Sequence, residues 1–210
     1  FSRLLDWGLR LTLLLAAPAA LALAIIAVPL IATLFYHGAF TEHDVFMTRN
    51  ALIAYSIGLL GMILVKVLAP GFYARQNVRT PVKIGIFTLC VTQALNLALI
   101  GWLQHAGLAL AIGLAACLNA LLLYRGLRRH DIYTPQAGWR SFCGKLLIAL
   151  TAMGGVLWFA SGTATDWLHW GLTERLWRLM LIVTAGASTY FATLALTGFR
   201  LRDFKRKAAT

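Results

Sequence analysis

The amino-acid sequence predicts an all-α membrane protein of six transmembrane helices with both termini in the cytoplasm. Of the 210 residues, 60% are hydrophobic and only 12% are charged, whereas soluble domains average about 45–50% apolar and about 25% charged residues. The apolar residues are grouped in blocks close to the length of about 20 residues that a helix needs to cross a bilayer. The basic residues lie mostly between these blocks and alternate in density from one gap to the next. Together these observations exclude a soluble domain and indicate a bundle of membrane-spanning helices.

The six expected helices follow one another with short gaps. They cover residues 11–36, 51–74, 80–103, 107–124, 142–162 and 176–199. The loop lengths between them suggest three parts. These are four helices in residues 1–124, a basic cytoplasmic loop in residues 125–141, and two further helices with a basic tail in residues 142–210.

Local signals mark the ends and the packing of several helices. Pro18 and Pro29 interrupt the first block, and membrane helices tolerate such prolines with local kinks. Thr80-Pro81 is typical of an N-cap followed by proline in the first helical turn. In the fourth block small residues recur at four-residue spacing, which predicts that helices approach each other closely there. These small residues are Ala109, Gly113 and Cys117.

The charges in the loops predict the orientation. Lys and Arg mark the cytoplasmic side of membrane proteins because short basic loops resist translocation. Fifteen of the 19 basic residues lie before the first block, around the second or fourth gap, or after the sixth block. This alternation predicts cytoplasmic termini, and it accounts for the net charge of +12 without a nucleic-acid partner.

The remaining composition indicates neither an enzyme nor a cofactor protein. The five histidines are scattered, and no His or Cys pair has the spacing of a metal site. The three cysteines fall in or beside apolar blocks, as small packing residues do. All seven acidic residues lie in predicted loops or termini, so paired carboxylates for catalysis or proton relay are missing from the spans. The chain begins with Phe1 rather than Met, and we expect Phe1 to lie in the interior of a longer protein.

Lys66 is the sharpest polar feature within a predicted span. An ionisable side chain in a membrane helix is a functional hypothesis by default, although a lysine stem can also reach the cytoplasmic headgroups. Tyr55 and Tyr73 fall on nearly the same helical face as Lys66, and we take all three as candidates for a transport cavity. Pro70-Gly71 follows, where we expect a break in the helix and a candidate hinge.

A polar stripe follows the third predicted helix. Thr88, Thr92 and Asn96 recur at four-residue spacing, with Gln93 at the edge of the same face. Asn119 of the fourth helix could meet them. The stripe could hold helices together by interhelical hydrogen bonds, which we favour, or it could line a solute path. In the second case Gln93, Asn96 and Asn119 are further cavity candidates.

The longest cytoplasmic connection, residues 125–145, mixes aromatic and basic residues. Ile132, Tyr133, Trp139 and Phe142 alternate with basic side chains, as in a segment that lies in the membrane interface. We interpret it as a basic loop resting against anionic lipid rather than as a partner site.

The stretch Val65-Lys66-Val67-Leu68-Ala69-Pro70-Gly71-Phe72-Tyr73-Ala74-Arg75-Gln76, followed by Thr80-Pro81-Val82-Lys83, resembles the lipid II flippase family MurJ, also called MviN. The similarity covers essentially the whole chain in order. It extends to residues 5–10, 51–56, 105–108, 113–119 and 199–207.

The resemblance implies a multi-pass transporter of the bacterial inner membrane. It would move the undecaprenyl-pyrophosphate-linked peptidoglycan precursor to the periplasmic leaflet by alternating access. The family fold has fourteen helices: two six-helix lobes around a central cavity, and two C-terminal helices that form a lipid-facing groove. The six helices of this chain would be the ninth to the fourteenth. Its partners would then be the missing N-terminal helices, the lipid-linked precursor and membrane lipids.

Other functions compete with this one. A related exporter of the same superfamily (MOP), moving drugs or polysaccharide lipids, would not be expected to carry the motif at residues 69–76. A membrane enzyme acting on polyprenyl lipids would need interfacial acids that the sequence does not offer. A membrane anchor without catalytic function is a fourth alternative.

Overall fold

The computed structural model describes residues 2–198, apart from the side chain of Gln104, and these residues are helical apart from short connections. Two helices are short, and α4 holds two antiparallel spans, so six segments are long and apolar enough to cross a membrane. The helical class and the six spans that the sequence predicts are thereby confirmed. The predicted basic tail from residue 199 onward lies outside the described residues. The helices are α1 (Ser2–Ile25), α2 (Ala27–Leu34), α3 (Glu42–Tyr73), α4 (Arg79–Arg129), α5 (Trp139–Ser161), α6 (Ala164–His169) and α7 (Leu172–Leu196).

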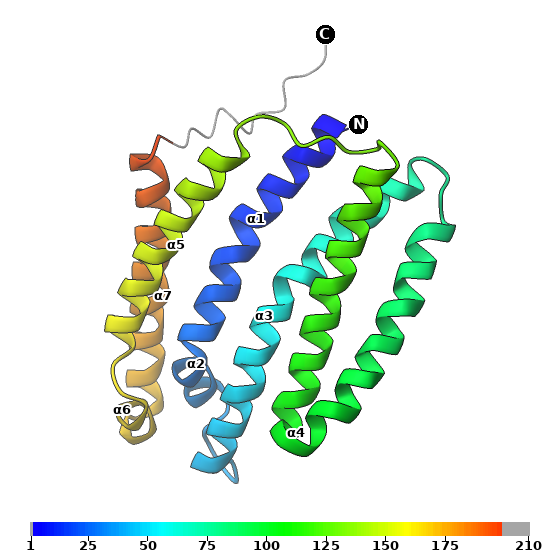
Figure 1. Cartoon of the computed structure of the whole chain (residues 1–210). Helices are drawn as coiled ribbons and strands as arrows, with labels where there is room; N and C mark the ends of the chain where they lie inside the picture. The colour runs from blue at the N-terminus through cyan, green and yellow to red at the C-terminus, as the bar shows by residue number, and fades with distance from the viewer. Residues whose placement is uncertain (1, 199–210) are drawn as a thin grey trace.

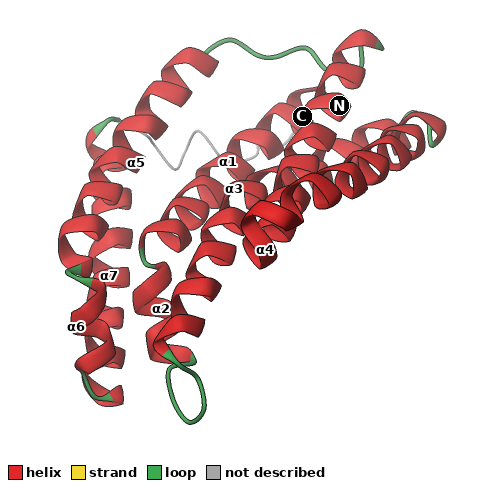
Figure 2. Ribbon diagram, turned by 60° about the horizontal axis from the view of Figure 1, so that its bottom comes forward, coloured by secondary structure: helices red, strands yellow, loops and turns green. Residues whose placement is uncertain are grey.

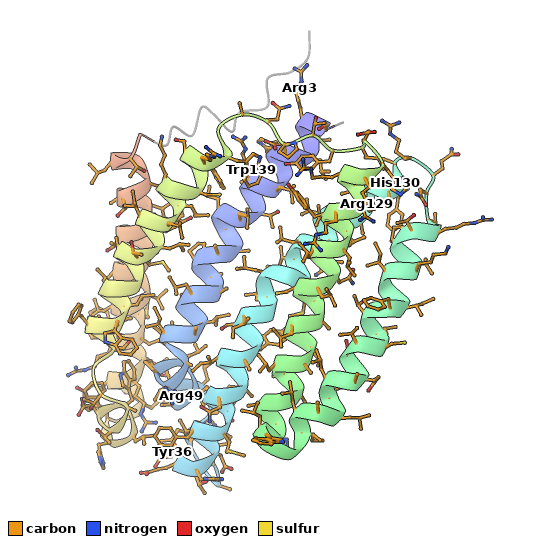
Figure 3. The ribbon with its side chains drawn as sticks, in the orientation of Figure 1. Arg3, Tyr36, Arg49, Arg129, His130 and Trp139 are labelled. Atoms are coloured by element: carbon orange, nitrogen blue, oxygen red, sulfur yellow. The ribbon has the colours of Figure 1, made fainter. Side chains whose placement is uncertain are left out.

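The two ends of the bundle differ in charge. Figure 1 shows that α1 begins and α7 ends at the same end, where the connections 74–78 and 130–138 also lie. Arg3, Arg129 and Trp139 are at this end in Figure 3, whereas Arg49 lies at the other. We call the first end the basic end and the other the opposite end. The opposite end holds the connection 35–41, the turn inside α4, and α6.

The spans stand beside one another in a curved row. α7 packs on α5, α1 packs on both α5 and α3, and α3 packs on α4. Figures 1 and 2 show this order, with the first half of α4 at one edge of the row. That half, residues 79–103, is the least buried of the six spans. One side of the bundle is therefore open along a whole helix.

Small residues allow α3 and α4 to touch backbone to backbone. A Cβ atom added to Gly58 would overlap the Cα atom of Gly113. One added to Gly61 would lie 2.5 Å from the backbone nitrogen of Cys117. Backbones approach this closely only where side chains are absent or small. The close packing predicted from the spacing of Gly113 and Cys117 is confirmed.

The two prolines of the first block act differently. Pro18 has no N–H for the carbonyl of Leu14, four residues earlier. The hydroxyl of Tyr190 on α7 donates to that carbonyl instead, at 2.6 Å, and α1 continues without interruption. At Pro29 the helix does break, because α1 ends at Ile25 and α2 begins at Ala27. The ring of Pro29 would clash with the carbonyl of Ile25, which accounts for the position of the break.

Three local expectations differ from the structure. Thr80 is not the cap of α4, which begins at Arg79 after the N-cap Val78; instead the Asn77 Oδ1 accepts from the backbone N–H of Thr80 at 3.2 Å and from its hydroxyl at 3.1 Å. The expected loop at residues 104–105 is a tight helical turn, in which a Cβ on Gly107 would lie 2.6 Å from the carbonyl oxygen of Leu99. The expected break at Pro70 is absent, because α3 runs through it to Tyr73.

Candidate functional site

A buried carboxylate joins α1 to the connection 130–138 at the basic end. Asp6 is 4% exposed. Its Oδ1 accepts hydrogen bonds from the hydroxyl of Tyr133 at 2.7 Å, the indole N–H of Trp139 at 2.7 Å and the backbone N–H of Gln136 at 3.2 Å. Its Oδ2 lies 2.8 Å from the Nε of Arg10. A buried charge is tolerated when it is paired and hydrogen-bonded in this way.

Two of these partners are held in place by further contacts. The Arg10 guanidinium donates to the carbonyl of Ala137 at 3.0 Å and lies 5.2 Å from the ring centre of Trp139. Burial, and then the hydrogen bond to Asp6, raise the pKa of Tyr133 above its usual value. The Tyr133 hydroxyl therefore stays protonated and remains a donor throughout the physiological pH range.

Two residues of the connection 130–138 pack on the protein, while its other residues are exposed. Ile132 and Tyr133 are buried in a core that they share with residues of α1, α3 and α4. Our interpretation of this segment as an interfacial loop is wrong for these two side chains. The physical reason is that the Tyr133 hydroxyl donates to the carboxylate of Asp6, which is distant in the sequence, and this hydrogen bond holds the segment against the bundle.

An apolar groove of about 240 Å³ lies between α1, α5 and α7. Leu14 and Pro18 line it from α1, Met153 from α5, and Val183 and Phe191 from α7. Val183 and Phe191 are about half exposed, so the groove is open to the surface of the bundle. α5 and α7 cross tightly beside it, because a Cβ on Gly186 would lie 2.6 Å from the Leu157 side chain.

The candidates on α3 share an uncovered face. Lys66, Tyr55 and Tyr73 are all exposed, while Gly58 and Gly61, on a different side of α3, pack against α4. Within the described part of the chain, Lys66 makes neither an ion pair nor a side-chain hydrogen bond. The structure therefore presents these three residues on one exposed face of α3, and Lys66 has no polar partner there among residues 2–198.

The two hinge candidates lie near the end of α3. Pro70 is exposed, and it offers no N–H to the carbonyl of Lys66. Gly71 is buried, and a Cβ there would lie 2.9 Å from the Leu127 side chain. Gly71 thus serves close packing against α4.

The polar stripe on α4 is not a network. Thr88 donates to the carbonyl of Gly85, and Thr92 donates to the carbonyl of Thr88, so both hydroxyls bond within their own helix. Our interpretation of these threonines as interhelical links is wrong, because the helix offers its own carbonyls at shorter reach.

The amides near the stripe have no side-chain partner in the described residues. Gln93 is exposed, while Asn96 and Asn119 are half-buried and are not joined to each other by a hydrogen bond. The Oδ1 of Asn96 is a buried atom without a hydrogen-bond partner among those residues. A buried unpaired acceptor carries a desolvation cost, which a further partner would remove.

Sequence reasoning missed Asp6 as a structural centre and Arg175 as a buried residue. Arg175 is 6% exposed, and its guanidinium donates to the carbonyls of Ala32, Tyr36 and Leu168 at 3.0, 3.2 and 2.9 Å. It thereby satisfies carbonyls at the ends of α2 and α6, which have no partner within their own helices. Both residues look like ordinary loop charges in the sequence. Only the i, i+4 spacing of Asp6 and Arg10 gave a local hint.

Comparison with known proteins identifies the family. The family model described as lipid II flippase MurJ matches residues 1–181. The lipid II flippase MurJ of Burkholderia cenocepacia is 46% identical over 99% of this chain and 40% of its own length. The probable lipid II flippases MurJ of Vibrio cholerae and Haemophilus influenzae are both 40% identical, over 98% and 95% of this chain.

The chain spans about 40% of the length of these relatives. Its six apolar spans and its bacterial relatives identify it as a multi-pass protein of the inner membrane. The match to the family model and the identity along nearly the whole chain lead to one assignment. This chain belongs to the MurJ family of lipid II flippases.

Proposed function

We propose that this chain acts as the C-terminal part of a lipid II flippase. The complete protein would carry the undecaprenyl-pyrophosphate-linked peptidoglycan precursor from the cytoplasmic to the periplasmic leaflet by alternating access. The observation that carries the proposal is the similarity to relatives named lipid II flippases along nearly the whole chain. The activity is transport rather than catalysis, and the basic end faces the cytoplasm.

The uncovered face of α3 fits the wall of a transport cavity. Lys66 lies in the inner part of a membrane span, with Tyr55 and Tyr73 on the same exposed face. An ammonium group in a membrane interior is costly unless it meets a counter-charge or water. The pyrophosphate of the cargo, or an acid from another helix of the complete protein, would supply that counter-charge in one state of the cycle.

Pro70 would make α3 easier to bend beside this cation. The carbonyl of Lys66 has lost its usual helical donor, because residue 70 is a proline. A helix with a missing hydrogen bond kinks more readily at that point. We assign to Pro70 and Gly71 a bend of α3 that moves the Lys66 face between states.

The open edge of α4 fits contact with the rest of the transporter. Gln93 and Asn96 lie on its first half, the least buried span, and Asn96 has a buried oxygen without a partner among the described residues. Side-chain amides hydrogen-bond across helices in membrane proteins. We assign this edge, together with Asn119, to the helices that the N-terminal part of the transporter supplies.

The apolar groove between α1, α5 and α7 would receive the polyprenyl tail of the cargo. Its lining is almost wholly hydrocarbon, and it opens toward the lipid. Moving a CH₂ group of the tail from the lipid into the groove gains only van der Waals packing energy, since the surrounding lipid tails are equally apolar. The groove therefore orients the tail rather than binding it tightly.

Complementation tests the proposal. The complete protein containing this chain is expressed in a bacterium depleted of its own flippase, and growth and the appearance of lipid II in the outer leaflet are measured. The complete protein is expected to restore both. Residues 1–210 alone are expected to insert in the membrane without restoring either, because part of a cavity cannot open alternately to the two sides of the membrane. Normal membrane insertion of the complete protein without any lipid II transfer would contradict the proposal.

A further inference from the structure

A second, polar cavity lies at the basic end of the same helices that form the apolar groove. It has a volume of about 400 Å³. The start of α1, the connection 130–138, the start of α5 and Gly198, two residues after the end of α7, surround it. Arg3, Arg10, Lys145, Ser141 and Gly138 are among its lining residues.

The charge in this cavity is positive. Among the described residues, the one acid that lines it is Asp6, whose carboxylate already accepts from Tyr133, Trp139 and Gln136 and pairs with Arg10. Arg3 and Lys145 form no ion pair with any described residue. Two cations are therefore left for an anion from outside.

The backbone adds donors beside these cations. Gly138 adopts φ = 94°, a left-handed conformation that suits glycine, and α5 starts directly after it. In the part of the chain that the structure describes, no side chain caps the first N–H groups of α5. The Ser141 hydroxyl lies in the same turn and is a further donor to an oxygen ligand.

The polar cavity and the apolar groove lie one after the other along α1, α5 and α7 and share no lining residue. Leu14 of the groove lies one turn beyond Arg10 on α1, and Met153 lies about two turns beyond Lys145 on α5. Phe191 lies about two turns before Gly198 at the end of α7. At about 1.5 Å of rise per residue, the two cavities are separated by roughly 6–12 Å. A ligand with a charged head and a hydrocarbon chain matches this arrangement.

We propose that the polar cavity binds the phosphate group of a membrane lipid whose hydrocarbon chain lies in the groove between α1, α5 and α7. Arg3 and Lys145 provide the charge, and Ser141 and the first N–H groups of α5 provide directed donors. A phospholipid and a polyprenyl phosphate share this chemistry. The inference depends on the membrane placement of the six spans and not on transport, so lipid retention without flipping would contradict the proposed function alone.

Charge-neutral variants test the site. Arg3→Gln combined with Lys145→Gln removes the two unpaired cations and leaves the Asp6 contacts intact. Lys83→Gln combined with Arg128→Gln is the matched control, since it removes two exposed cations from the same end but outside the cavity. The protein, with any upstream part that its gene encodes, is purified in nanodiscs. The lipids that remain bound are counted by native mass spectrometry.

Three probes distinguish the sources of the phosphate. They are phosphatidylglycerol, undecaprenyl phosphate and inorganic pyrophosphate. At about 1 kcal/mol for each cation near an anionic group, the cavity variant should bind its lipid roughly thirtyfold more weakly. The control variant should bind it as the parent does. The lipid whose affinity falls more in the cavity variant is the natural occupant.

Two outcomes would overturn the inference. If lipid affinity falls equally in the cavity variant and in the control, the lipid is held only by general attraction between anionic lipid and a basic surface. Equal affinity for inorganic pyrophosphate and for both lipids would show that the groove contributes nothing and that the ligand is not a lipid.

Discussion

At the scale of single residues, one buried charged side chain at each end of the bundle holds the segments of that end together. Asp6 at the basic end and Arg175 at the opposite end are 4% and 6% exposed. Each contacts segments more than a hundred residues away in the sequence. Buried ions of this kind are costly to leave without partners, so the segments around them are held to one arrangement.

Asp6 is predicted to contribute more to the stability of the fold than Asp166, an exposed acid that caps a helix. Asp6→Asn leaves Arg10 without its counter-charge, and breaking a buried pair costs about 3 kcal/mol or more. Asp166→Asn, in the exposed capping box of α6, should cost less than about 1 kcal/mol. Thermal unfolding of the purified protein in detergent measures both. Equal stability of the two variants would show that the Asp6 cluster is not a structural centre.

Lys66 is predicted to act through its charge. In the complete protein, Lys66→Ala and Lys66→Met should fail to support growth of a flippase-depleted strain at normal membrane abundance, while Lys66→Arg should support it partly. Lys83→Met, an exposed cation at the start of α4, is the control and should grow normally. If Lys66→Met grows as well as the parent, the charge is dispensable and the lysine stem simply extends to the headgroups.

At the scale of elements, the contact between α3 and α4 depends on missing side chains. Gly58→Val should destabilise the protein by about 1–3 kcal/mol or more, because the new Cβ would overlap the Gly113 backbone and overpacked cores must shift. Gly85→Val on the open half of α4 is the control, since a Cβ there meets nothing within 4 Å. Denaturation by heat or by added harsh detergent compares the two. The predicted crossing would be refuted if Gly85→Val were the more damaging change.

At the scale of the whole molecule, the basic end is predicted to face the cytoplasm. The start of α3, the turn inside α4, and α6, which contain His43, Gln104 and Asp166, all lie at the opposite end. Single cysteines at these three positions should react with a membrane-impermeant thiol reagent in intact cells, whereas a cysteine at Arg128 should not. Labelling at Arg128 instead would reverse the orientation. The background protein must first lose its own cysteines, which are Cys90, Cys117 and Cys143.

The sequence determined the number of spans and their order, and it singled out candidate residues within them by their polarity. These properties are local, because a block of about 20 apolar residues partitions into the bilayer whatever its neighbours are. The spacing of Gly113 and Cys117 also predicted which side of a helix would be packed, since helical periodicity belongs to the segment itself. The motif at residues 65–76 is sufficient by itself to indicate the family.

The tertiary structure alone decided which distant groups meet. Asp6 and Tyr133 are 127 residues apart, and Arg175 and Ala32 are 143 residues apart, so no local pattern pairs them. The effect of each proline on its helix also depended on its surroundings. Tyr190 of α7 donates to the carbonyl that Pro18 leaves without a helical donor, whereas the helix is interrupted before Pro29. Periodicity in one helix specifies a face but not its neighbour, and the neighbour is set by how all six spans pack.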